Sequence, residues 1–244
     1  MTLPFVSQFA VAPVLANDID TTVIDQKSAH LALRVNFVPV LASISKTKNR
    51  PLIDYQWVSV EALQVQWLMG WFKRWFCHRD TILVKGEHEP EYFAATDTEP
   101  AKIVFAHGFF ASALHEISHW CMAGQKRRLL NDFGYWYAPD GRNEEQQQQF
   151  EQVEILPQAI ECLLTLACNK PFSVSKDNLF ADFDTSQSTF EADVQAQAVK
   201  FWQTGQKLST DAKVLLSQLT KLRPLPLTSF DISHNFIKVN FYQS

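Results

Sequence analysis

The feature that most constrains how this chain can fold is a pair of histidines with three residues between them, in the segment His115-Glu116-Ile117-Ser118-His119. Positions i and i+4 of an α-helix lie one above the other on the same face, so the two imidazoles can bind one metal ion together. Apolar side chains recur at spacings of three and four around the motif and predict a helix over residues 109–123, ended by Gly124. The apolar run 103–106 predicts a short buried strand before this helix, with His107-Gly108 as the turn between them.

A bound metal would explain why two histidines stand this close beside apolar positions. Two half-buried imidazoles repel each other when both are protonated, and a metal ion keeps both neutral. A catalytic metal site usually has three protein ligands and one open position. We expect the third ligand to be a carboxylate on a second helix, predicted over residues 144–161, that packs antiparallel to the first. Glu154 is the first choice and Glu151 the alternative.

Two histidines and one carboxylate are compatible with two kinds of catalytic metal. In a zinc-dependent metallopeptidase, Glu116 would be the general base that deprotonates a metal-bound water. Non-haem iron(II) oxygenases use the same ligand set, and Glu116 would then assist proton transfer. His107, on the turn before the helix, could hydrogen-bond to a metal ligand and orient it in either case. The motif alone leaves both chemistries open, together with a non-catalytic adaptor that the metal stabilises.

The composition excludes several other classes of protein. A net charge of −4 gives no general attraction for nucleic acid, and 46% hydrophobic residues indicate a folded chain. Only 7 glycines argue against a turn-dense β-sandwich, so we predict an α+β fold, a mainly helical domain with a small mixed sheet. The cysteines lack the spacing of a disulfide framework and are expected to be reduced and buried, as in a cytoplasmic protein. Neither a signal peptide nor a membrane span is expected.

The domain organisation is predicted from changes in pattern along the chain. Residues 1–55 form an extension of unknown role, 56–230 the metal-dependent domain, and 231–244 a C-terminal tail. Within the domain, further elements are expected at these positions: a helix over 57–78, strands at 81–85 and near 92–93, a helix that continues through 164 although Pro157 interrupts its hydrogen-bond ladder, and one long helix over 190–219.

Several blocks of the sequence, in the same order, resemble bacterial elongation factor P hydroxylases. The metal helix and the strand before it, residues 103–121, form the longest block, and the segment that carries Glu151 and Glu154 forms another. The other blocks are residues 85–92, 132–142 and 171–179, and the likeness extends over about residues 58–205. Residues 1–50 have no counterpart in that family.

The resemblance implies an activity and a ligand set. Members of the family hydroxylate the β-lysylated lysine of translation elongation factor P, which would be the protein substrate and partner here. They hold a metal with two histidines and a carboxylate, which implies Fe²⁺ at His115, His119 and Glu154, or Glu151 in its place, with dioxygen as co-substrate. A need for 2-oxoglutarate is left open. The resemblance also implies a metallopeptidase-like (zincin-like) fold around the metal helix.

The long cationic substrate that the resemblance implies needs a cleft with acidic and aromatic walls, since cations favour aromatic faces. A loop with three consecutive aromatic residues supplies candidates, and Glu116 is another. The predicted substrate-binding residues of this loop are Tyr135, Trp136, Tyr137 and Asp140. The basic cluster Lys126-Arg127-Arg128 could contact an acidic surface of the protein substrate.

Overall fold

The structure is a computed structural model that describes residues 37–47, 50–134, 141–176, 178, 183, 188–222, 226–229 and 231–232. The chain divides into two units, Met1–Trp75 and Phe76–Ser244. The predicted boundary between an extension and a domain, at residues 55 and 56, stays a prediction. Within the described residues, no helix is long and apolar enough to cross a lipid bilayer.

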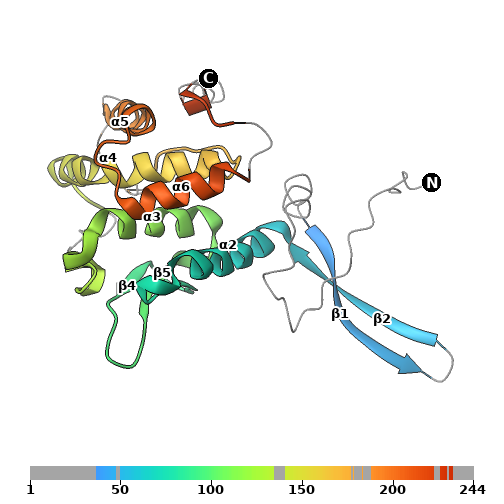
Figure 1. The fold of residues 1–244 in the computed structure, drawn as a ribbon. Helices are drawn as coiled ribbons and strands as arrows, with labels where there is room; N and C mark the ends of the chain where they lie inside the picture. The colour runs from blue at the N-terminus through green and yellow to red at the C-terminus, as the bar shows by residue number, and fades with distance from the viewer. Residues whose placement is uncertain are drawn as a thin grey trace. The chain divides into compact units, whose positions relative to one another are not determined.

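The first unit contains a β-hairpin and most of a helix (Figure 1). Strands β1 (Phe37–Thr47) and β2 (Arg50–Ser59) are antiparallel, with Phe37 opposite Ser59 and Thr47 opposite Arg50. Helix α2 (Val60–Phe76) confirms most of the helix that the sequence predicted, but residues 57–59 belong to β2. The alternation of large β-formers up to Trp57 explains this, because aromatic and β-branched residues favour a strand over a helix start.

The second unit begins with a small mixed sheet, which the sequence predicted. Its strands are β3 (Thr81–Lys85), β4 (Glu91–Phe93) and β5 (Ala101–Phe105). Strand β5 lies in the middle, parallel to β3 and antiparallel to β4. The side chains of Ala101, Ile103 and Phe105 are buried and alternate with less buried neighbours, which gives β5 one core-facing side.

Helix α3 (Phe110–Arg127) follows β5 and carries the histidine pair. It packs against β5 on one side and against helix α4 (Glu144–Ala167) on another (Figure 1). The sequence predicted that Gly124 ends the metal helix. Gly124 does leave helical geometry, with φ 66°, but a last helical turn continues beyond it to Arg127. The break therefore lies after the site and does not disturb the spacing of the histidines.

Helix α4 begins with a capping box and passes through a proline. The side chain of Asn143 accepts from the backbone N–H of Gln146, and the side chain of Gln146 accepts from the backbone N–H of Asn143. The sequence predicted that Pro157 interrupts the hydrogen-bond ladder while the helix continues through residue 164, and α4 does continue, as far as Ala167. Residues 157–167 are all buried, and this packing maintains the helix despite the hydrogen bond that a proline removes.

The prediction of one long helix over residues 190–219 is wrong, because this segment forms two helices, α5 (Phe190–Thr204) and α6 (Thr210–Thr220). Gly205 adopts the left-handed conformation, with φ 59°, and its N–H bonds to the carbonyl of Phe201. Ser209 then caps α6, since its side chain accepts from the N–H of Ala212. Both signals are readable in the sequence, but a continuous apolar periodicity on either side conceals them.

Replacing Gly205 by alanine should lower the free energy of unfolding by about 1 kcal/mol, because a Cβ disfavours left-handed backbone. The nearest side-chain atom to a new Cβ would be 3.8 Å away, so the cost comes from the backbone and not from a clash. Urea unfolding followed by circular dichroism measures it. Asparagine, which tolerates this conformation better, should cost less than alanine; equal values for the two variants would contradict the assignment.

The four cysteines are free, as expected, but the expectation that all are buried is wrong. Cys121 and Cys162 are buried, and burial raises the pKa of both thiols, so they behave as small apolar side chains. Cys77 is exposed and Cys168 is half-buried. Cys77 stands in the short 3₁₀ turn Cys77–Arg79 that follows α2, where the amphipathic pattern no longer dictates which side chains face inward.

Candidate metal centre

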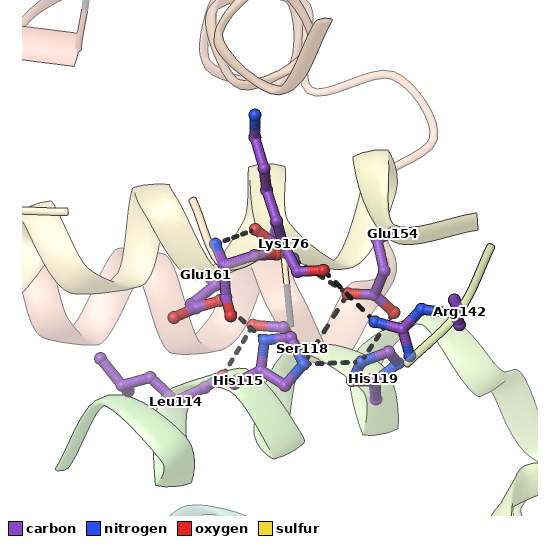
Figure 2. Close-up of polar contacts among 10 residues, drawn as sticks. Leu114, His115, Ser118, His119, Arg142, Glu154, Glu161 and Lys176 are labelled. Carbon is purple, nitrogen blue, oxygen red and sulfur yellow. Dashed lines mark hydrogen bonds and ion pairs between the residues drawn. The ribbon is translucent and has the colours of Figure 1, made fainter. Parts of the chain in front are cut away.

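The site lies between helices α3 and α4, which pack side by side (Figure 2). His115 contacts Glu161, whereas His119, one turn later on α3, contacts Glu154, which lies earlier on α4. This order confirms that the two helices are antiparallel. The apolar stripe of α3, including Ile117 and Trp120, is fully buried and fixes the rotation of the helix. The histidines at the edge of that stripe consequently point toward α4.

Three potential ligand atoms converge between the helices. The Nε2 atoms of His115 and His119 are 3.0 Å apart, and Nε2 of His119 is 3.3 Å from Oε1 of Glu154. Nε2 of His115 is 3.7 Å from Oε2 of Glu154, and one ligand atom from each residue lies within 4.8 Å of the other two. Ligand atoms that are each about 2.1 Å from one metal ion lie about 3.0–3.4 Å apart. The donor set suits a single ion; two of the three distances lie in this range, and the third, 3.7 Å, is slightly longer.

Glu154 is buried, with 2% of its side chain exposed, and a neighbouring amide fixes its direction. Nε2 of Gln158 donates to Oε2 of Glu154 at 3.2 Å and to the carbonyl of Ser175 at 2.8 Å. The backbone N–H of Ser175 donates back to Oε1 of Gln158 at 2.9 Å. Sequence reasoning missed Gln158, although its position four residues after Glu154 was a signal, because i and i+4 side chains meet on a helix.

Glu151, the alternative third ligand, has other partners. Its Oε2 accepts from the hydroxyl of Ser188 at 2.7 Å, and its Oε1 accepts from Nε2 of Gln147 at 3.2 Å. Gln147 in turn accepts from Nε of the buried Arg142, whose guanidinium also covers the ring of Phe150. Glu151 thus belongs to a polar network at the start of α4, and the structure brings Glu154 to the histidines instead.

A second carboxylate that sequence reasoning missed, Glu161, contacts the other side of the His115 ring. Its Oε2 lies 2.8 Å from Nδ1 of His115, and 10% of its side chain is exposed. Glu161 follows Glu154 by seven residues, which is about two helical turns, so both carboxylates project from the same face of α4. That spacing was the available signal, but the apolar neighbours of Glu161 pointed to core.

Without a metal, the charges at the site hold a proton on His115. Burial disfavours the imidazolium, but the carboxylates of Glu161, Glu154 and Glu116 outweigh it and raise the pKa of His115 to about 10. The pKa of His119 is well below its usual value, because the ring is buried and faces the positive charge of His115. One histidine is thus charged and the other neutral, which is consistent with a hydrogen bond from Nε2 of His115 to Nε2 of His119 at 3.0 Å.

Glu116, the predicted proton-transfer residue, is half-buried beside His115. Burial raises its pKa to about 7; the charge of His115 opposes this rise, and the carboxylates of Glu154, Glu161 and Asp132 add to it. A carboxyl group with a pKa near 7 can both accept and donate a proton at neutral pH. This environment fits the role that the motif predicted for Glu116, which stays a prediction.

Of the other predicted site residues, the structure describes only His107. His107 is exposed, has a left-handed φ of 51°, and its ring centroid is 5.9 Å from that of Phe109. The four predicted substrate-binding residues, Tyr135, Trp136, Tyr137 and Asp140, lie outside the described residues.

Comparison with known proteins gives two concordant matches. Residues 71–227, which include both histidines and all the carboxylates described above, match the family model for Elongation factor P hydroxylase. A relative from Haemophilus influenzae named Elongation factor P lysine hydroxylase is 43% identical over 157 residues, or 63% of this chain and 88% of that protein. The chain therefore belongs to the elongation factor P hydroxylase family.

Proposed function

We propose that this protein hydroxylates the modified lysine of elongation factor P, with a non-haem iron(II) ion held by His115, His119 and Glu154. The observation that carries the proposal is the convergence of these ligand atoms within 4.8 Å, in a chain of this family. Hydroxylation is an oxidation, and zinc has no redox chemistry, whereas two histidines and a carboxylate suit iron(II). The alternative, a zinc metallopeptidase, rests on the motif alone. The proposed zincin-like fold concerns only the arrangement around α3.

When bound, iron would activate dioxygen, so that one oxygen atom enters a carbon–hydrogen bond of the substrate. The other oxygen atom leaves as water with two electrons and two protons from an external two-electron reductant. The chain's own residues bind and orient the ion and move protons. Glu116, whose pKa is about 7, is the group we propose for proton transfer at the open side of the site.

We further propose that the substrate lysine carries a β-lysyl group, as the resemblance implies. Such a side chain bears positive charge, and the half-buried Glu116, which is not one of the proposed metal ligands, is the acidic residue of the described structure that we propose to face it. Exposed Lys126 and Arg127 remain candidates for contact with the partner. Arg128 does not, because its guanidinium pairs with Asp211 and covers the ring of Trp120.

The intact mass of elongation factor P, isolated from cells with and without this protein, tests the proposed function. We expect the modified factor to lose the mass of one oxygen atom when the protein is absent, and to regain it when the gene is restored. Cells that cannot attach the β-lysyl group separate the finer proposal: an added oxygen in those cells would contradict it. Identical masses with and without the protein would contradict the function itself.

Binding of a metal by the purified protein should strengthen as pH rises. The metal must displace the proton on Nε2 of His115, whose pKa is about 10. We expect the apparent affinity for zinc to rise about tenfold per pH unit between pH 6.5 and 9, as one proton is released per ion. The stability of the metal-free protein should change in the opposite sense. The raised pKa of His115 stabilises the fold at pH values below about 6.5, and this contribution is lost as the pH rises toward 10.

Melting curves with and without zinc across this pH range measure both effects. The melting temperature of the metal-free protein should fall as pH rises, while the increase caused by zinc grows. A pH-independent affinity would contradict the displacement of a proton from His115. Added EDTA should abolish the zinc effect at every pH.

A further inference from the structure

We propose that Glu161 is a positioning residue of the metal centre. Its carboxylate accepts the Nδ1–H of His115 and thereby directs the Nε2 lone pair of that ring toward the metal. The inference rests on the proposed function, because it requires a metal ion bound at Nε2. The inference adds Glu161 to the three proposed ligands, as a residue that acts on the metal through His115.

The His115 ring lies between two carboxylates of the same helix (Figure 2). Its Nδ1 is 2.8 Å from Oε2 of Glu161, and its Nε2 is 3.7 Å from Oε2 of Glu154. Seven residues of α-helix separate the two acids by about 10 Å along the helix axis. This separation leaves room for an imidazole between them, with one nitrogen facing each acid.

The contact with Glu161 decides which nitrogen carries the proton. An ionised carboxylate can only accept, so a hydrogen bond at 2.8 Å requires the proton to be on Nδ1. A neutral imidazole then has its lone pair on Nε2, the atom that faces Nε2 of His119 at 3.0 Å. The tautomer that Glu161 imposes is therefore the one in which His115 can act as a ligand at the point where the three ligand atoms converge.

The surroundings of Glu161 argue against a role in folding alone. The residues around it, Ala159, Ile160, Cys162 and Leu163, are apolar and buried. A charged side chain at such a position costs free energy unless it is paired, and its hydrogen-bond partner here is the ring of a proposed ligand. Carboxylates in this place orient ligand histidines and strengthen their electron donation to the metal.

Zinc affinity, measured by competition with a chromogenic chelator, tests the proposal without relying on activity. Glu161→Ala should weaken zinc binding about 10–100-fold relative to the unaltered protein. Glu161→Gln should weaken it less, because the amide oxygen still accepts the Nδ1–H but carries no charge. The matched control is Glu145→Gln, an exposed acid on the same helix, which should leave the affinity unchanged.

Nitrogen-15 spectra of the zinc-loaded protein provide a readout that a purely structural residue would not move. The unaltered protein should show His115 protonated at Nδ1, with that proton at low field. In Glu161→Gln the signal should persist but shift upfield, since a neutral acceptor forms a weaker hydrogen bond. This variant keeps the side-chain shape, so the test stands even where Glu161→Ala does not fold.

The outcomes separate the two proposals. Failure of the unaltered protein to bind zinc or ferrous ion would overturn the metal site and the inference with it. Normal metal binding with an unchanged affinity in both Glu161 variants, or an unchanged Nδ1–H signal in Glu161→Gln, would overturn the role of Glu161 alone. The proposed function would stand in that second case.

Discussion

Replacing His115 by alanine is expected to weaken metal binding by more than about 100-fold. Loss of a ligand should cost more than loss of a residue that only hydrogen-bonds to a ligand, such as Glu161. Hydroxylation of elongation factor P should be lost with it. The reason is geometric: without His115, only His119 and Glu154 remain, and the charge of Glu161 loses its partner. A metal ion held by two protein ligands dissociates more readily than one held by the usual three.

Metal content after gel filtration and the mass of elongation factor P from complemented cells measure the two losses. The matched control is His88→Ala, because His88 is exposed and lies in the turn between β3 and β4. It should leave both properties unchanged. A His115→Ala protein that folds, binds iron normally and still supports hydroxylation would contradict the proposed centre. One that folds and binds the partner but has lost hydroxylation would rule out a purely structural role for the metal.

Asp211→Ala is expected to lower the free energy of unfolding by about 3 kcal/mol or more, because it leaves two cations without their counter-ion. Asp211 is 6% exposed, and its oxygens accept from Arg79 at 2.9 Å and from Arg128 at 2.7 Å. Arg128 also donates to the carbonyl of Trp120 in α3. The pair of Asp211 and Arg128 therefore joins α6 to the end of α3. The 30% exposure of the Arg79 side chain reduces its share of the cost.

Chemical denaturation of the metal-free protein checks this value, with Asp97→Ala as the control. Asp97 lies in an exposed turn and should cost within about 0.5 kcal/mol. Since Asp211 does not contact the histidines, zinc affinity at a temperature where the variant is folded should be close to normal. A stability loss no larger than that of Asp97→Ala would show that the arginines find other partners.

Much of the candidate site could be predicted from short patterns. The spacing of His115 and His119 specifies which helix face they share, because one helical turn repeats every 3.6 residues. The strand before them and the antiparallel second helix also followed from apolar periodicity, which left both Glu154 and Glu151 as candidate ligands on that helix. Boundaries were less predictable: the segment over 190–219 is two helices, since Gly205 and Ser209 end one and start the next within an otherwise helical pattern.

The sequence by itself determined the ligand types, the pairing of histidines on one face and the membership of a family that the order of its motifs reveals. Only the tertiary structure decided which carboxylates of α4 meet them. Rotation and register of α4 against α3 depend on the packing of many buried side chains, which no local spacing records. That packing sets Glu154 beside both Nε2 atoms, engages Glu151 with Ser188, and brings Glu161 to the far side of His115.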